Sequence, residues 1–75
     1  NPRTIICYQL TVSSEIELSI YNILGQKVAT LVSDKQPAGR YEVEWNASGF
    51  ASGLYFYKLT TDKGDSKTKK LVLIN

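Results

Sequence analysis

The chain has 75 residues, 43% of them hydrophobic, 11% aromatic and 21% charged, and nine Lys or Arg stand against seven Asp or Glu. This length and composition predict one small globular domain, residues 1–75, and exclude a disordered tail, a collagen-like repeat and a coiled coil. The net charge of +2 is too weak to predict binding to nucleic acid, which takes a concentrated basic surface.

The chain begins with two segments in which apolar and polar residues alternate, the period of a strand with one buried face. The residues predicted to be buried in these two strands are Ile6, Tyr8, Leu10, Ile16, Leu18 and Ile20. Glu15 and Glu17 occupy the opposite face of the second segment, so we expect them to face water. The next four residues, Asn-Ile-Leu-Gly at 22–25, are typical of a short hairpin loop.

Residues 26–33 fit two kinds of structure. Val28 and Leu31 are three positions apart, which suits a helical turn as well as a strand that contains a bulge. The short length and the β-branched residues of this segment favour a strand. Residues 36–39, Gln-Pro-Ala-Gly, follow with Pro and Gly at the positions that a type I turn prefers.

The second half of the chain adds three predicted strands. In the first, Tyr41, Val43 and Trp45 share one face, while Glu42 and Glu44 share the other. Residues 54–61 and 67–74 are rich in β-branched and aromatic residues, but their pattern leaves open which face is buried. Asp-Lys-Gly-Asp at 62–65 is a turn between them. Six or seven strands separated by such turns predict an all-β, antiparallel sandwich.

The residue types that catalysis and metal binding require are scarce in this sequence. Cys7 is the only cysteine and there is no histidine, which excludes an internal disulfide and the usual base of nucleophilic catalysis. Asp62 and Asp65 offer too few oxygen ligands for a calcium loop. The longest apolar run, residues 71–74, is far shorter than the ~20 residues of a membrane helix. We therefore expect no enzyme activity, no cofactor, no metal site and no membrane span.

The aromatic residues allow two interpretations. They could form a platform for sugar rings, as in a carbohydrate-binding module, or they could fill the core. Because Tyr41, Val43 and Trp45 lie on one face of a strand, the core is favoured for them. Phe50, and whichever of Phe56 or Tyr57 points outward, are then the aromatic residues left for a ligand. Four lysines near the end are expected at solvated strand and turn positions: Lys63, Lys67, Lys69 and Lys70.

Five short motifs occur in a set order along the chain. They are Ile-Tyr-Asn-Ile-Leu-Gly-Gln-Lys-Val at 20–28, Ala-Gly at 38–39, Tyr-Glu-Val-Glu-Trp-Asn at 41–46, Ala-Ser-Gly-Leu-Tyr-Phe-Tyr-Lys-Leu at 51–59 and Lys-Lys-Leu-Val-Leu at 69–73. This set resembles the C-terminal sorting domain of the type IX secretion system, a family similar to the immunoglobulin-like domain of the flagellar hook-capping protein. The resemblance covers the whole chain and implies an all-β, immunoglobulin-like sandwich of six or seven strands.

The resemblance also implies a function and a set of positions. The terminal signal corresponds to Lys69, Lys70, Leu71, Val72 and Leu73, and the characteristic loop glycines correspond to Gly39 and Gly53. The implied partners are the outer-membrane secretion machinery, a cell-surface sortase, and an N-terminal cargo domain in the same chain, which in many relatives is a hydrolase or an adhesin. The implied destination is the surface or the medium of a Gram-negative bacterium, reached through the periplasm.

Other features of the ends agree with a piece of a larger protein. The chain starts with Asn1 rather than Met, so we expect a longer parent chain. The family's Asn-Pro-rich lead is reduced here to Asn1-Pro2-Arg3, and Cys7 stands where a small polar residue is more usual. These departures leave the cleavage region undefined. We expect the domain itself to be a monomer.

The last strand is the predicted recognition element. At a sheet edge, its unpaired backbone groups can recruit a partner by strand addition. Lys69 and Lys70 are then expected to set the electrostatic register, while Leu71 and Leu73 pack inward. In the alternative, the segment is an ordinary core strand whose removal only unfolds the domain. Two other functions stay open: a carbohydrate-binding module of a secreted hydrolase, and an assembly module that self-associates.

Overall fold

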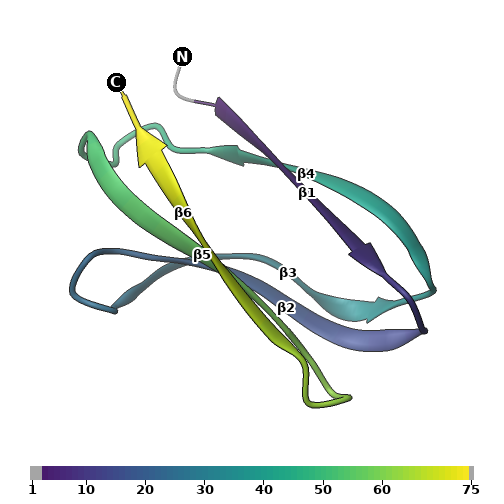
Figure 1. The fold of residues 1–75 in the computed structure, drawn as a ribbon. Helices are drawn as coiled ribbons and strands as arrows, with labels where there is room; N and C mark the ends of the chain where they lie inside the picture. Colours follow the sequence, from purple (N-terminus) through teal and green to yellow (C-terminus); the bar gives the residue numbers. More distant parts are fainter. Residues whose placement is uncertain (1–2, 75) are drawn as a thin grey trace.

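The computed structural model describes residues 3–74 (Figure 1). Its strands are β1 (Arg3–Leu10), β2 (Ser14–Tyr21), β3 (Lys27–Gln36), β4 (Gly39–Asn46), β5 (Gly53–Thr61) and β6 (Ser66–Leu73), with no helix in the described part of the chain. All pairs are antiparallel, in one sheet of order β1-β4 and one of order β3-β2-β5-β6. The prediction of an all-β, immunoglobulin-like sandwich of six or seven strands is confirmed, with six strands.

The core lies between the two sheets and is built from the alternating apolar residues. Its buried members are Ile6, Leu18, Ile20, Trp45, Ala47, Tyr55 and Leu73. Leu10 and Ile16, also predicted to be buried, are buried as well. Tyr8 differs, because it is only half-buried at the side of the sandwich. Burial of apolar surface between the sheets is the main source of stability for such a small sandwich.

Strand β3 resolves the ambiguity of residues 26–33 in favour of a strand with bulges. Between the pairs Leu18–Val32 and Ser19–Thr30, the register of β3 against β2 shifts by one residue. A second shift lies between the pairs Ile20–Ala29 and Tyr21–Lys27. The extra residues of β3 at these shifts are Leu31 and Val28, and both pack against the core. Their spacing of three therefore comes from two bulges, each of which returns an apolar side chain to the inner face.

The predicted turns join the strands in two different ways. Residues 22–25 close the β2–β3 hairpin, where Asn22 exchanges hydrogen bonds with Gln26 and accepts one from the Leu24 amide. Residues 62–65 close the β5–β6 hairpin through hydrogen bonds between Thr61 and Asp65. Pro37 and Ala38, in contrast, carry the chain from β3 in one sheet to β4 in the other.

An ion pair between β2 and β3 predicts a small acid sensitivity. Lys27 Nζ donates to Glu17 Oε2 at 2.6 Å, and Ser19 Oγ donates to the same oxygen at 2.7 Å. These hydrogen bonds, that of Lys27 first, hold the pKa of the Glu17 carboxyl below its usual 4.5. A lowered folded-state pKa stabilises the fold above the unfolded-state pKa, and this contribution is lost as the pH falls through the folded-state value.

We therefore expect Glu17→Gln to lower the midpoint of urea unfolding modestly at about pH 6, because the variant lacks the ionic hydrogen bonds. The difference from the wild-type protein should shrink as the pH falls below the usual carboxyl pKa of 4.5 and the wild-type carboxylate takes up a proton. Urea titrations at several pH values measure this difference. A difference that stays constant down to about pH 3 would contradict the role given to the ion pair.

Candidate functional site

Strand β6, which carries the predicted terminal signal, lies at the edge of the four-stranded sheet. Within residues 3–74 it pairs only with β5, in a register that runs from Gly53–Leu73 to Thr60–Ser66. Figure 1 shows β6 in yellow at the front of the sandwich, with its C-terminal end near the start of β1. The sequence left the strand order open; in the structure this strand lies at an edge, so one side of its backbone is open to a further strand.

The five signal residues divide between the two faces of β6. Leu73 is 3% exposed and Leu71 packs against the core, so both point inward as predicted. Val72 points outward and is 64% exposed. Lys70 shares the outer face with Val72, whereas Lys69 lies on the inner face with the leucines. The two lysines therefore do not form one charged patch, because neighbouring residues of a strand point to opposite sides.

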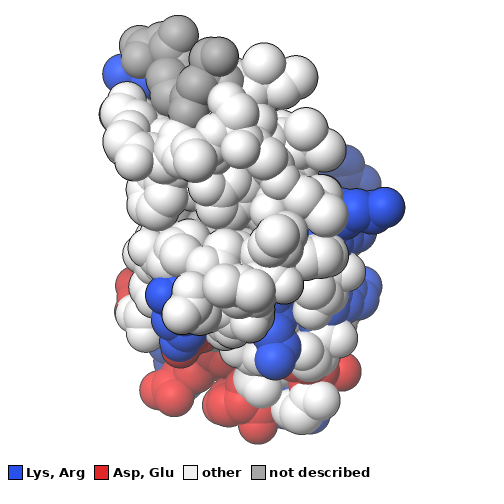
Figure 2. Space-filling model, turned by 90° about the vertical axis from the view of Figure 1, so that its left-hand side faces the viewer, with Lys and Arg blue, Asp and Glu red and all other residues white. Residues whose placement is uncertain are grey.

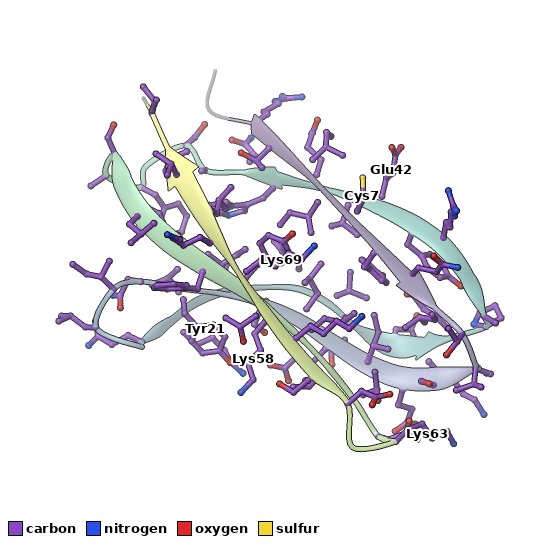
Figure 3. All side chains as sticks on the ribbon, in the orientation of Figure 1. Cys7, Tyr21, Glu42, Lys58, Lys63 and Lys69 are labelled. Atoms are coloured by element: carbon purple, nitrogen blue, oxygen red, sulfur yellow. The ribbon has the colours of Figure 1, made fainter. Side chains whose placement is uncertain are left out.

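The outer side chains of β6 continue a partly exposed surface formed by the neighbouring strands. We call this surface the outer patch, and it comprises Tyr21, Leu54, Phe56, Lys70 and Val72. Leu54 pairs with Val72, and Phe56 pairs with both Lys70 and Tyr21. In Figure 3, Tyr21 lies on the outer side of the four-stranded sheet. Of the two aromatic residues left open by the sequence, Phe56 is the outward one and Tyr57 packs against the core.

The end of the molecule next to the outer patch has few charges. Figure 2 views the end that carries the β2–β3 hairpin, and most of this face is free of charged side chains. The charged groups gather along one side and at the lower end of the view. Ile23 and Leu24, at the tip of the hairpin, are 67% and 78% exposed. Exposed apolar residues that cluster in this way are typical of a protein-binding surface.

The two predicted motif glycines share one structural role. Gly39 and Gly53 begin β4 and β5 with φ angles of 153° and 151°, which residues with a side chain rarely adopt. Two positions further on, the hydroxyl of Tyr41 donates to the Pro37 carbonyl and that of Tyr55 to the Ala51 carbonyl. Each Gly-x-Tyr motif thus closes the connection that precedes its strand. The glycines shape the backbone, and their geometry gives them no direct part in the outer patch.

The remaining aromatic residues pack mainly on one another. Trp45 is 2% exposed, and its ring lies 5.3 Å from that of Phe50 and 5.5 Å from that of Tyr55. The prediction that Phe50 is left for a ligand is wrong, because it packs against the core. The prediction that Tyr41 fills the core is wrong. This residue is half-buried and stacks on Tyr8, with the ring centroids 5.2 Å apart. This pairing across β1 and β4 could not be read from the sequence.

The other residues considered for chemistry are spread over the surface. Cys7 is exposed on the outer face of the two-stranded sheet, where its Sγ lies 3.9 Å from Glu42 Oε2 (Figure 3). Asp62 accepts a hydrogen bond from the Glu15 amide, as part of the turn. Among residues 3–74, no three His, Cys, Asp or Glu side chains gather as potential metal ligands. Over the same range, no helix is present that could cross a membrane.

Comparison with protein families gives one match. The family described as secretion system C-terminal sorting domain matches residues 1–75, which include all six strands, the predicted signal residues of β6 and both Gly-x-Tyr motifs. Comparisons with curated proteins and with solved structures find no match.

Proposed function

The chain belongs to the family of secretion system C-terminal sorting domains, and on that premise we propose that residues 1–75 form a single, non-catalytic module that directs a larger cargo protein across the outer membrane. In general, a domain of this family marks its cargo as a secreted or cell-surface protein of a Gram-negative bacterium. The finer proposal is that the secretion machinery recognises the folded strand β6, and that a cell-surface sortase then acts on the cargo.

The exposure of β6 is the observation that supports this proposal most directly. The strand lies at a sheet edge, and its outer face presents Lys70 and Val72 beside Phe56. Its inner face is anchored in the core by Leu71 and Leu73. A receptor can therefore contact Lys70 and Val72 in the outer patch, and the backbone edge of β6, without unfolding the domain. The cargo domain, placed before residue 1 in this proposal, would join near the same end of the sandwich, where β1 starts and β6 ends (Figure 1).

A reporter fusion tests the sorting function. A periplasm-directed fluorescent protein carrying residues 1–75 at its C-terminus should appear in the medium or at the cell surface of a bacterium that has the type IX system. The same reporter without the domain should remain in the periplasm, and so should the fusion in a strain that lacks the outer-membrane translocon. Export of the bare reporter to the same extent as the fusion would refute the proposal.

A further inference from the structure

The sandwich has an open cleft on the side where β1 and β6 lie. This cleft has a volume of about 730 Å³. Tyr8 and Tyr41 lie on the wall formed by the two-stranded sheet, and the opposite wall, formed by β5 and β6, carries Tyr57, Leu59, Lys67 and Lys69. A second hollow of about 220 Å³ adjoins the cleft near the end of β1 and shares Gln9, Leu59 and Lys67 with it; Asp65 also lines this hollow.

The cleft exists because the two sheets are unequal. Two strands cover a sheet of four, and the inner face of β6 is covered only toward its end, at Leu71 and Leu73. At Lys67 and Lys69 the same face carries lysines instead of leucines. Figure 3 shows Lys69 in the space between β6 and β1. Lysine is suited to these positions because they face inward and yet remain accessible to water. A strand added to β1 would cover both lysines.

The lining of the cleft has a positive net charge, because Arg40, Lys67 and Lys69 stand against Glu42, while Asp65 lines the adjoining hollow. Within residues 3–74, neither Lys67 nor Lys69 has a carboxylate within 4.0 Å. Arg40 and Glu42 also line the cleft, but they belong to the outward-facing side of β4. Figure 3 shows Glu42 beside Cys7, at the rim formed by the two-stranded sheet, whereas Lys67 and Lys69 belong to the inner face of β6. Two ammonium groups without a partner next to tyrosine rings favour a ligand that brings negative charge and apolar surface together.

Both long walls of the cleft offer backbone hydrogen-bonding groups. In the described part of the chain, β1 pairs only with β4, and β6 pairs only with β5. An extended peptide laid beside β1 gains main-chain hydrogen bonds, and every second side chain of it points toward the opposite wall. The rings of Tyr8 and Tyr41 are stacked on each other. Because each ring already stacks on the other, the unpaired backbone groups of β1 and β6 are the main binding groups that the cleft offers to a ligand. Such groups favour a peptide over a sugar chain.

We propose that this cleft binds an extended protein segment with acidic side chains at alternate positions, which adds to β1 as a third strand of the smaller sheet. Its acidic side chains meet Lys67 and Lys69, and its backbone pairs with the open side of β1. A segment of about six residues, about 20 Å long, covers most of β1. This binding surface is separate from the outer patch and does not depend on the proposed sorting function.

Peptide titrations of the isotopically labelled 75-residue chain, followed by nuclear magnetic resonance, test this inference. The probe is a capped hexapeptide of alternating valine and glutamate, and the charge control replaces each glutamate by lysine. The acidic peptide should shift the amide signals of β1 and β6 and slow hydrogen exchange in β1. Lys67→Gln with Lys69→Gln should weaken binding roughly tenfold or more, because the two cations on the β6 wall of the cleft are lost.

The matched control is Lys58→Gln with Lys63→Gln, which removes two lysines from the outer face of β5 and from the β5–β6 turn. This variant should bind the acidic peptide within about twofold of the wild-type affinity. Equal losses in the two double variants, or equal binding of the lysine peptide, would show only unspecific attraction and overturn the inference. So would unchanged hydrogen exchange in β1, or equal affinity for hexagalacturonic acid, a sugar chain of similar charge.

Discussion

Replacing Leu18 by alanine is expected to remove a large share of the free energy of unfolding. Leu18 is fully buried in the middle of β2, which pairs with β3 on one side and β5 on the other. Truncation of a buried leucine costs about 2–5 kcal/mol, because apolar contacts are lost and a cavity remains. A domain of 75 residues has a total stability on the order of 4–11 kcal/mol. If the total stability lies near the lower end of this range, the variant should be partly unfolded even without denaturant.

Trp45 makes this prediction simple to measure. It is the only tryptophan of the chain and is 2% exposed, so its fluorescence reports on the core during urea unfolding. The matched control is Ile5→Ala, on the outer face of β1, where the side chain is 55% exposed. We expect this control to change the stability by no more than about 0.5 kcal/mol. Similar midpoints for the two variants would mean that Leu18 is not at the centre of the core.

Replacing Lys70 by alanine together with Val72 by threonine is expected to reduce export of the reporter fusion by roughly tenfold or more, as for loss of an interface anchor. Both side chains belong to the outer patch, and neither is needed for the core. Threonine preserves the β-branched shape of valine, so β6 should form as before. The stability of the isolated domain should change by less than about 1 kcal/mol in total. Reporter activity in the medium and urea unfolding of the domain measure the two effects.

A control for this variant uses the same kinds of residue on other strands. Lys35→Ala with Ile5→Thr removes an exposed lysine from β3, the other edge of the same sheet, and an exposed apolar side chain from β1. This pair should leave export unchanged. If both double variants export equally well, the outer patch is not the recognised surface. If the β6 variant unfolds, its loss of export reports only on stability, and the interpretation as an ordinary core strand is favoured.

Lys69 and Lys70 lie on opposite faces of β6. Lys69 is on the inner face, in the cleft, and Lys70 is on the outer face. The sequence-based prediction grouped these neighbours as one basic pair. A double substitution would change the cleft and the outer patch at the same time, so its effect could not be assigned to either surface. Single substitutions of each lysine are therefore the sharper experiment, because only Lys70 belongs to the proposed recognition surface.

The alternation of residue types was enough to predict the strands and most of their inner residues. Alternation is a local property: a residue's neighbours two positions away lie on the same face, so Ile6 and Leu18 could be placed in the core without knowing any partner strand. The hairpin turns at 22–25 and 62–65 are local as well, since their residues form hydrogen bonds within a few positions. The family's motifs extended this to the fold type, and they predict the positions of the sorting signal.

The pairing of the strands and the direction of several side chains depend instead on contacts between distant parts of the chain. In β5 both faces carry apolar or aromatic residues, so the inward direction of Tyr57 and the outward direction of Phe56 follow from pairing with β2 and β6. The bulges of β3 likewise depend on its partner, because register is a relation between two strands. The stacking of Tyr8 on Tyr41 and the cleft beside them arise from residues that are far apart in the chain. Such contacts depend on how unequal sheets pack in space, which no local pattern of residues encodes.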